Sequence, residues 1–182
     1  HMQTSPTCAG AIKTSQETLE EAALKIRGGP AAPYLSRHGI VHLMESERRD
    51  DAISLLTDFD FLMQRLANTD EQGLNAEGAA ITQDDWRLVL EQGPLNDRRH
   101  QLWEDFWRTT EHLLRRGDVD WPANRILLQT AIEHADDSPV TISAEKWLEE
   151  DNCDWFWLNK VNRSRKVAIN PCIRVLEGHS GW

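Results

Sequence analysis

Apolar residues recur at helical spacing along most of this chain, between residue 14 and about residue 158. The clearest run lies between Asp97 and Arg116, and one face of it would carry Leu102, Trp103, Phe106, Trp107, Thr110, Leu113 and Leu114. A stripe with this three- and four-residue spacing indicates an amphipathic helix whose apolar side packs against other elements. The pattern predicts an all-α fold.

Shorter stripes of the same kind predict further helices on both sides of this run. They cover about residues 14–26, 34–47, 50–56, 59–66, 86–90, 121–132 and 139–148. The segment from Asn68 to Gly78 is rich in Gly, Asn and Asp and is predicted to be a loop. Helices joined by breaks of a few residues favour antiparallel packing. We expect either an antiparallel helical bundle or a short solenoid-like arm, although no clean internal repeat is visible.

Residues with known preferences for helix ends mark several of the boundaries. Side-chain acceptors that would cap helix starts are Thr14 with Glu17, Asp58, Thr82 with Asp85, Asp120, and Ser138 before Pro139. Helix stops are predicted at Gly28-Gly29-Pro30, at Gly93-Pro94, and at Gly117, which is placed for a left-handed C-cap.

The pattern divides the chain into three parts. Residues 1–13 are small and polar and are predicted to be a tag remnant followed by a flexible tail. Residues 14–158 form the predicted helical domain. Residues 159–182 lose the helical stripe, begin with a basic linker and end in an extended tail, in which Cys172 to Leu176 is β-prone.

Composition narrows the classes of partner. The formal net charge of the 182 residues is -10, and an acidic chain repels both nucleic acid and anionic membrane surfaces unless it carries a local basic patch. No apolar run approaches the length of a membrane span. Cys8, Cys153 and Cys172 are odd in number and widely spaced, which favours free thiols in a reducing, cytoplasmic compartment. We expect no nucleic-acid partner and no membrane partner.

The sequence offers little that could carry catalysis. His38 and His42 would share one helical face, but Gly39 stands where a helical zinc-protease motif requires glutamate, and no third ligand is suggested. No Gly-x4-Gly-Lys-Ser/Thr phosphate loop and no Gly-x-Gly-x-x-Gly motif occurs. We therefore expect no enzymatic activity, no cofactor and no metal site.

Two features near the end of the helical domain suggest interaction instead. Trp155, Phe156 and Trp157 form an aromatic cluster. The following segment, from Lys160 to Arg174, carries five cations and no acid. Such a segment can attract nucleic acid, but a solvated linker is the more ordinary interpretation.

The last eight residues, Val175 to Trp182, resemble the opening of a WD-repeat β-propeller, where a Leu-x-Gly-His turn links successive blades. The stretches 121–129, 134–141 and 153–158 resemble the helical region that precedes the propeller in bacterial NACHT–WD-repeat proteins, which are STAND-type signalling NTPases. Residues 42–62 are similar to the equivalent region of apoptotic protease-activating factors.

This resemblance implies a non-catalytic helical connector between an upstream NTPase switch and a downstream sensing propeller of the same parent protein. It implies that His179 belongs to the propeller's hydrogen-bond network and that the strand at 173–176 lacks its partner. The residues predicted to take part in interactions are Trp155, Trp157, Arg163, Arg165, Lys166 and His179.

Two alternatives stay open at this level. A free-standing helical module could bind a peptide or protein partner in an apolar groove. A metal-dependent enzyme using His38 and His42 is the weaker alternative.

Overall fold

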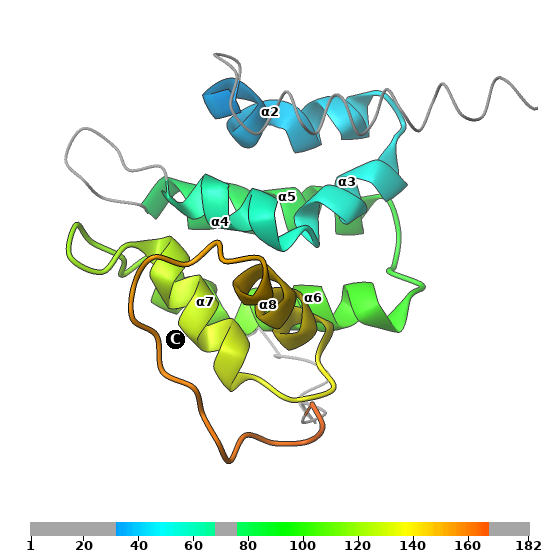
Figure 1. The fold of residues 1–182 in the computed structure, drawn as a ribbon. Coiled ribbons are helices and arrows are strands. Elements are labelled where there is room, and N and C mark those ends of the chain that lie inside the picture. The colour runs from blue at the N-terminus through cyan, green and yellow to red at the C-terminus, as the bar shows by residue number, and fades with distance from the viewer. Residues whose placement is uncertain (1–31, 68–75, 168–182) are drawn as a thin grey trace, which may run out of the picture.

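The computed structural model describes residues 32–67 and 76–167, and within these ranges the fold is all-helical, as predicted (Figure 1). The helices are α2 (Ala32–Glu45), α3 (Arg49–Leu56), α4 (Phe59–Ala67), α5 (Ala76–Glu91), α6 (Arg98–Leu114), α7 (Ala123–Glu133) and α8 (Pro139–Glu149). The predicted tail at 1–13, the helix at 14–26, most of the predicted loop and the strand at 173–176 lie outside the described residues.

The helices form a compact bundle around α4. Figure 1 shows α2 on one side of α3, α4 and α5, with α6, α7 and α8 on the other side. Helix α4 contacts α2, α3, α5, α7 and α8, although α7 and α8 are distant from it in sequence. In a solenoid each unit contacts only its neighbours along the chain. The described residues therefore form a bundle and not a solenoid-like arm.

The central position of α4 explains why its sequence is apolar on nearly every side. Of its nine residues, Phe59, Phe61, Leu62, Met63, Arg65 and Leu66 are buried. Helices with a single neighbouring layer bury one stripe, as α6 does with Trp103, Phe106, Trp107 and Leu114. The predicted stripe of α6 is thus its core face.

The one charged side chain buried on α4, Arg65, ties this helix to two others. Its Nη1 lies 2.7 Å from Oδ2 of Asp85 and 3.0 Å from the hydroxyl oxygen of Thr82, both on α5. Its Nε donates to the carbonyl oxygen of Ser36 on α2 at 2.6 Å. Burial raises the pKa of Asp85, and the adjacent guanidinium opposes that rise. Removing either Arg65 or Asp85 would therefore leave the other charge buried without compensation.

This ion pair corrects one predicted helix start. The sequence pattern placed Thr82 and Asp85 in a capping box, but α5 begins six residues earlier than Thr82, at Ala76. Inside the helix the Thr82 hydroxyl donates to the carbonyl oxygen of Gly78 at 2.9 Å. The prediction was wrong because the same short polar side chains that cap helices also serve as buried partners for a cation.

Two other predicted caps are confirmed and one is not. The carboxylate of Asp58 accepts the backbone N–H of Phe61 at 3.0 Å, and the hydroxyl of Ser138 accepts that of Val140 at 3.2 Å. Asp120 does not cap α7, because Pro122 holds that position. Instead Asp118 accepts the N–H groups of Asp120 and of the next residue, forming a turn before the helix.

Gly117 is required for a different reason from the one the sequence suggested. The φ angle of Gly117 does not lie in the left-handed range. Among the described glycines only Gly93 has such an angle, with a φ of 134°. A Cβ at Gly117 would lie 2.6 Å from the backbone nitrogen of Ala123 and 2.9 Å from its Cα. Glycine is needed here because the start of α7 packs directly against the end of α6.

We expect Gly117→Ala to lower the free energy of unfolding by about 1–3 kcal/mol, because the clash is with backbone atoms that move only if α7 shifts. Gly39→Ala is the matched control: nothing lies within 4 Å of a Cβ at this position in α2. Alanine in an open helical position should stabilise by about 0.4–1 kcal/mol. Urea unfolding followed by circular dichroism measures both. If both variants changed the free energy of unfolding in the same direction, Gly117 would not be closely packed.

Candidate docking surface

After α8 the chain forms a strap, residues 150–167, that runs along the outside of α7 (Figure 1). The backbone N–H of Leu158 donates to Gln129, and Arg163 donates to the carbonyl oxygen of Ile132. Further along, the N–H of Asp136 donates to Ser164, and the N–H of Val167 donates to Asp137. Along these contacts the residue numbers increase in the same direction in the strap and in α7 with the turn that follows it, so the two segments run parallel. The contacts themselves are mainly polar.

Arg163 is the strongest of these attachments. Its Nε lies 2.6 Å from Oδ1 of Asp136, its Nη2 donates to the carboxylate of Glu145 on α8, and its side chain is 16% exposed. Hydrogen bonds from the guanidinium to Asp136 and Glu145 raise the pKa of Arg163 above its already high ordinary value. The bridge therefore persists at any physiological pH and fixes the strap to both helices.

The first part of the strap folds back onto the bundle. Asp151 has a φ of 56°, which reverses the chain direction directly after α8. Asn152 Nδ2 then donates to the carbonyl oxygen of Trp147 at 3.1 Å, and the rings of Trp147 and Trp155 lie 5.9 Å apart. These contacts bring Trp155 to the N-terminal part of α7.

At that point one arginine contacts two indole rings. The guanidinium carbon of Arg125 on α7 is 5.3 Å from the ring centre of Trp155 and 5.8 Å from that of Trp121, which precedes α7. Cation–π contacts of this kind are worth about 0.5–1 kcal/mol each at exposed sites. They join the strap to the α6–α7 connection in one surface.

Large apolar side chains on this surface face the solvent. Phe156 is 97% exposed and Leu158 74%, while Trp121 and Trp157 are exposed by 43% and 36%. We define the aromatic patch as Trp121, Trp155, Phe156, Trp157 and Leu158. Several exposed apolar side chains on one surface are typical of an interaction site, whereas a single one is ordinary. Tryptophan and arginine are also the residues that dominate the energy of protein interfaces.

The predicted interaction residues fall into different environments. Trp155 and Trp157 belong to the aromatic patch, Arg165 and Lys166 are exposed on the strap, and His179 lies outside the described residues. The predicted solvated linker is wrong for Arg163, which forms the bridge described above. The interaction roles of the exposed residues stay predictions.

Sequence reasoning missed Trp121, Arg125 and Asp136 as parts of this surface and its attachment. The acidic residues after α7 and the basic residues of the strap have opposite charges, which could have suggested that they pair. The sequence does not show which residues meet, because Asp136 and Arg163 are 27 residues apart. The pairing depends on how the chain turns back after α8.

The two histidines considered for metal binding have other neighbours. Nε2 of His42 lies 2.9 Å from the Tyr34 hydroxyl, and its Nδ1 lies 3.3 Å from the carboxylate of Glu45. The ring centre of His38 lies 4.8 Å from that of Tyr34, and the two ring planes are tilted by 42°. Across residues 32–67 and 76–167, no group of three or more His, Cys, Asp or Glu side chains is arranged to hold a metal ion.

Comparison with known protein families, with curated proteins and with solved structures finds no match to this chain. None of the helices in the described ranges combines the length and the apolar character needed to cross a bilayer.

Proposed function

We propose that this chain is a non-catalytic helical connector that links an NTPase switch to a WD-repeat propeller within one signalling protein. The observation that carries the proposal is the strap. Polar contacts hold it to α7 and α8, while the apolar side chains of Phe156, Leu158 and Val161 face outward. This exposed surface lies just before the residues whose sequence resembles a propeller opening.

The fold suits the mechanical part of this role. A connector needs a stiff body and a surface at which the next domain docks. The helices share one core, and the buried bridge from Arg65 joins α2, α4 and α5. The aromatic patch supplies the surface, and its proposed occupant is the first blade of the propeller.

The coding sequence on either side of this segment tests the proposal directly. The connector requires a phosphate-binding loop upstream and repeated blades with Gly-His and Trp-Asp motifs downstream. Other neighbours on both sides would rule it out and leave the free-standing interaction module, in which the aromatic patch serves a separate protein.

The docking surface itself is tested by a double variant, Phe156→Ser with Trp157→Ser. We expect its affinity for the separately produced propeller, measured by calorimetry, to fall at least about 30-fold, because central aromatic side chains contribute about 2 kcal/mol or more to such interfaces. Leu90→Ser is the control, since Leu90 is 38% exposed on α5, away from the patch. Equal affinities of the two variants would exclude docking at the patch.

A further inference from the structure

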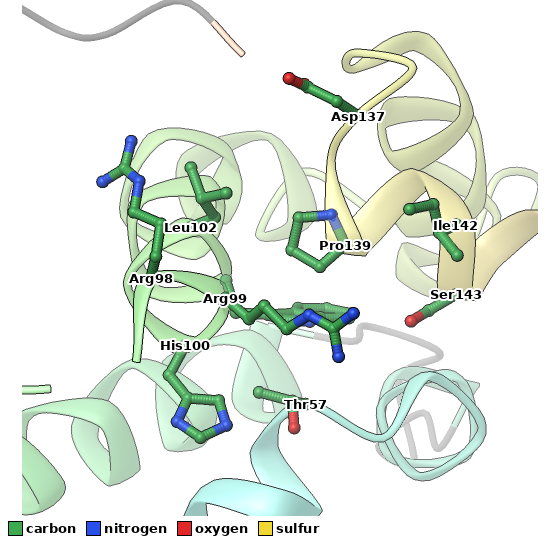
Figure 2. A pocket seen from close by; sticks show the side chains of 10 residues that line it. Thr57, Arg98, Arg99, His100, Leu102, Asp137, Pro139, Ile142 and Ser143 are labelled. Atoms are coloured by element: carbon green, nitrogen blue, oxygen red, sulfur yellow. The ribbon is translucent and has the colours of Figure 1, made fainter. Parts of the chain in front are cut away.

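A hollow of about 370 Å³ opens between the first turn of α6, the start of α8 and the end of α3 (Figure 2). It lies apart from the aromatic patch and plays no part in the proposed connector role. The lining residues that matter here are Thr57, Arg99, His100, Trp103, Ile142 and Ser143. Its size is within the range of pockets that bind small molecules.

The side chain that dominates the hollow is Arg99. Figure 2 shows it reaching from α6 across the opening toward Ser143 on α8. Within the described residues its guanidinium has no carboxylate partner and no hydrogen-bond acceptor. Its neighbour Arg98 also lines the hollow, and its Nη1 donates to Oε1 of Gln101 at 3.4 Å.

Arg99 is exposed and, like Arg116 and Arg165, forms no ion pair within residues 32–67 and 76–167; among these three it is the one that lines this hollow. Most arginines with neighbouring acids form ion pairs here, as Arg48, Arg87 and Arg108 do on their own helices. The one acid among the lining residues, Asp137, accepts the backbone N–H of Val167 at 2.8 Å and forms no ion pair with Arg99. The guanidinium of Arg99 can therefore pair with the anionic group of a ligand.

Polar and apolar groups beside Arg99 define what would fit. The hydroxyl of Ser143 and the ring of His100 have no partner among the described residues, so each offers a donor. Thr57 differs, because its hydroxyl already donates to carbonyl oxygens of α3. Ile142, 55% exposed, and Trp103 form an apolar side of the hollow.

We propose that this hollow binds a small anionic ligand with an apolar body. Its phosphate or carboxylate group is held by the guanidinium of Arg99 and the hydroxyl of Ser143, and its apolar part lies against Ile142. The planar guanidinium suits both oxyanions, because either accepts two parallel N–H bonds.

Calorimetric titration of the full chain with phenyl phosphate, phenylacetate and inorganic phosphate tests this site. One of the two aromatic anions should bind more tightly than inorganic phosphate, and the comparison between them identifies the preferred oxyanion. Arg99→Gln should weaken that binding by about tenfold or more, as expected for the loss of a bidentate, charge-assisted contact. Raising the salt concentration should weaken it too.

The matched control is Arg116→Gln, which makes the same change in charge just beyond the other end of α6 and should bind like the unmodified chain. Circular dichroism verifies that both variants fold. The proposal is overturned if neither aromatic anion binds, if inorganic phosphate binds as tightly as both, or if the two variants lose affinity equally. The last result would show attraction by overall charge alone.

Discussion

Arg65→Met is expected to lower the free energy of unfolding by about 3–5 kcal/mol, because it leaves the carboxylate of Asp85 buried without its counter-charge. The side chains of Arg65 and Asp85 are 2% and 4% exposed, so water cannot replace the lost partner. The variant also loses the bond from Nε of Arg65 to the carbonyl oxygen of Ser36. Urea unfolding at neutral pH measures the effect.

The double variant Arg65→Met with Asp85→Leu separates the pair from its parts. Buried ion pairs replaced by apolar side chains of similar size are often neutral or more stable, so we expect most of the loss to be recovered. If the double variant is as unstable as the single one, the loss comes from the contacts to Ser36 and Thr82 and not from the stranded carboxylate.

The single variant should also respond to pH. Burial raises the pKa of Asp85, and removing Arg65 takes away the charge that opposes this rise. The folded state then binds a proton more readily than the unfolded state, so stability should increase as the pH falls through the folded-state pKa of Asp85. The difference from the unmodified chain should therefore shrink in mild acid. A difference that grows on acidification would contradict this account.

Trp107→Ala is expected to cost about 3–5 kcal/mol, as usual for the truncation of a buried aromatic side chain. Trp107 is 1% exposed in the core face of α6, and its indole Nε1 has no hydrogen-bond partner among residues 32–67 and 76–167. Trp107→Phe should therefore cost clearly less than the alanine change, because it loses volume but no hydrogen bond. Thermal and urea unfolding measure both.

Trp121→Ala is the control for this series. Trp121 is 43% exposed and contacts Arg125 through its ring face, so the change should cost less than about 1 kcal/mol. If Trp107→Phe proved as costly as Trp107→Ala, the indole N–H would have to make a bond that the structure does not contain.

Much of the local structure follows from short-range patterns. The apolar stripe at 102–114 lies within α6, and Gly93-Pro94 follows the end of α5. Asp58 and Ser138 bond to backbone N–H groups two or three residues away. Such features depend on residues close in the sequence, so the sequence is sufficient to reveal them.

The candidate sites were less accessible from the sequence. Trp155 and Trp157 could be singled out as an aromatic cluster, but the contact of Arg125 with the rings of Trp121 and Trp155 could not. Arg99 was not singled out at all, because an unpaired arginine looks the same in a sequence as a paired one. The hollow beside it exists only once α3, α6 and α8 are packed together.

By itself the sequence determined the all-helical class and the approximate positions of most helices from α2 to α8, because helical spacing and end-capping act over a few residues. Tertiary structure alone decided that α4 lies at the centre, that Asp85 pairs with Arg65 rather than capping α5, and that Gly117 gives room to Ala123. It also decided that Arg163 bridges α7 and α8. These contacts join segments distant in sequence, and only the packing of the whole bundle fixes which charges and backbone atoms meet.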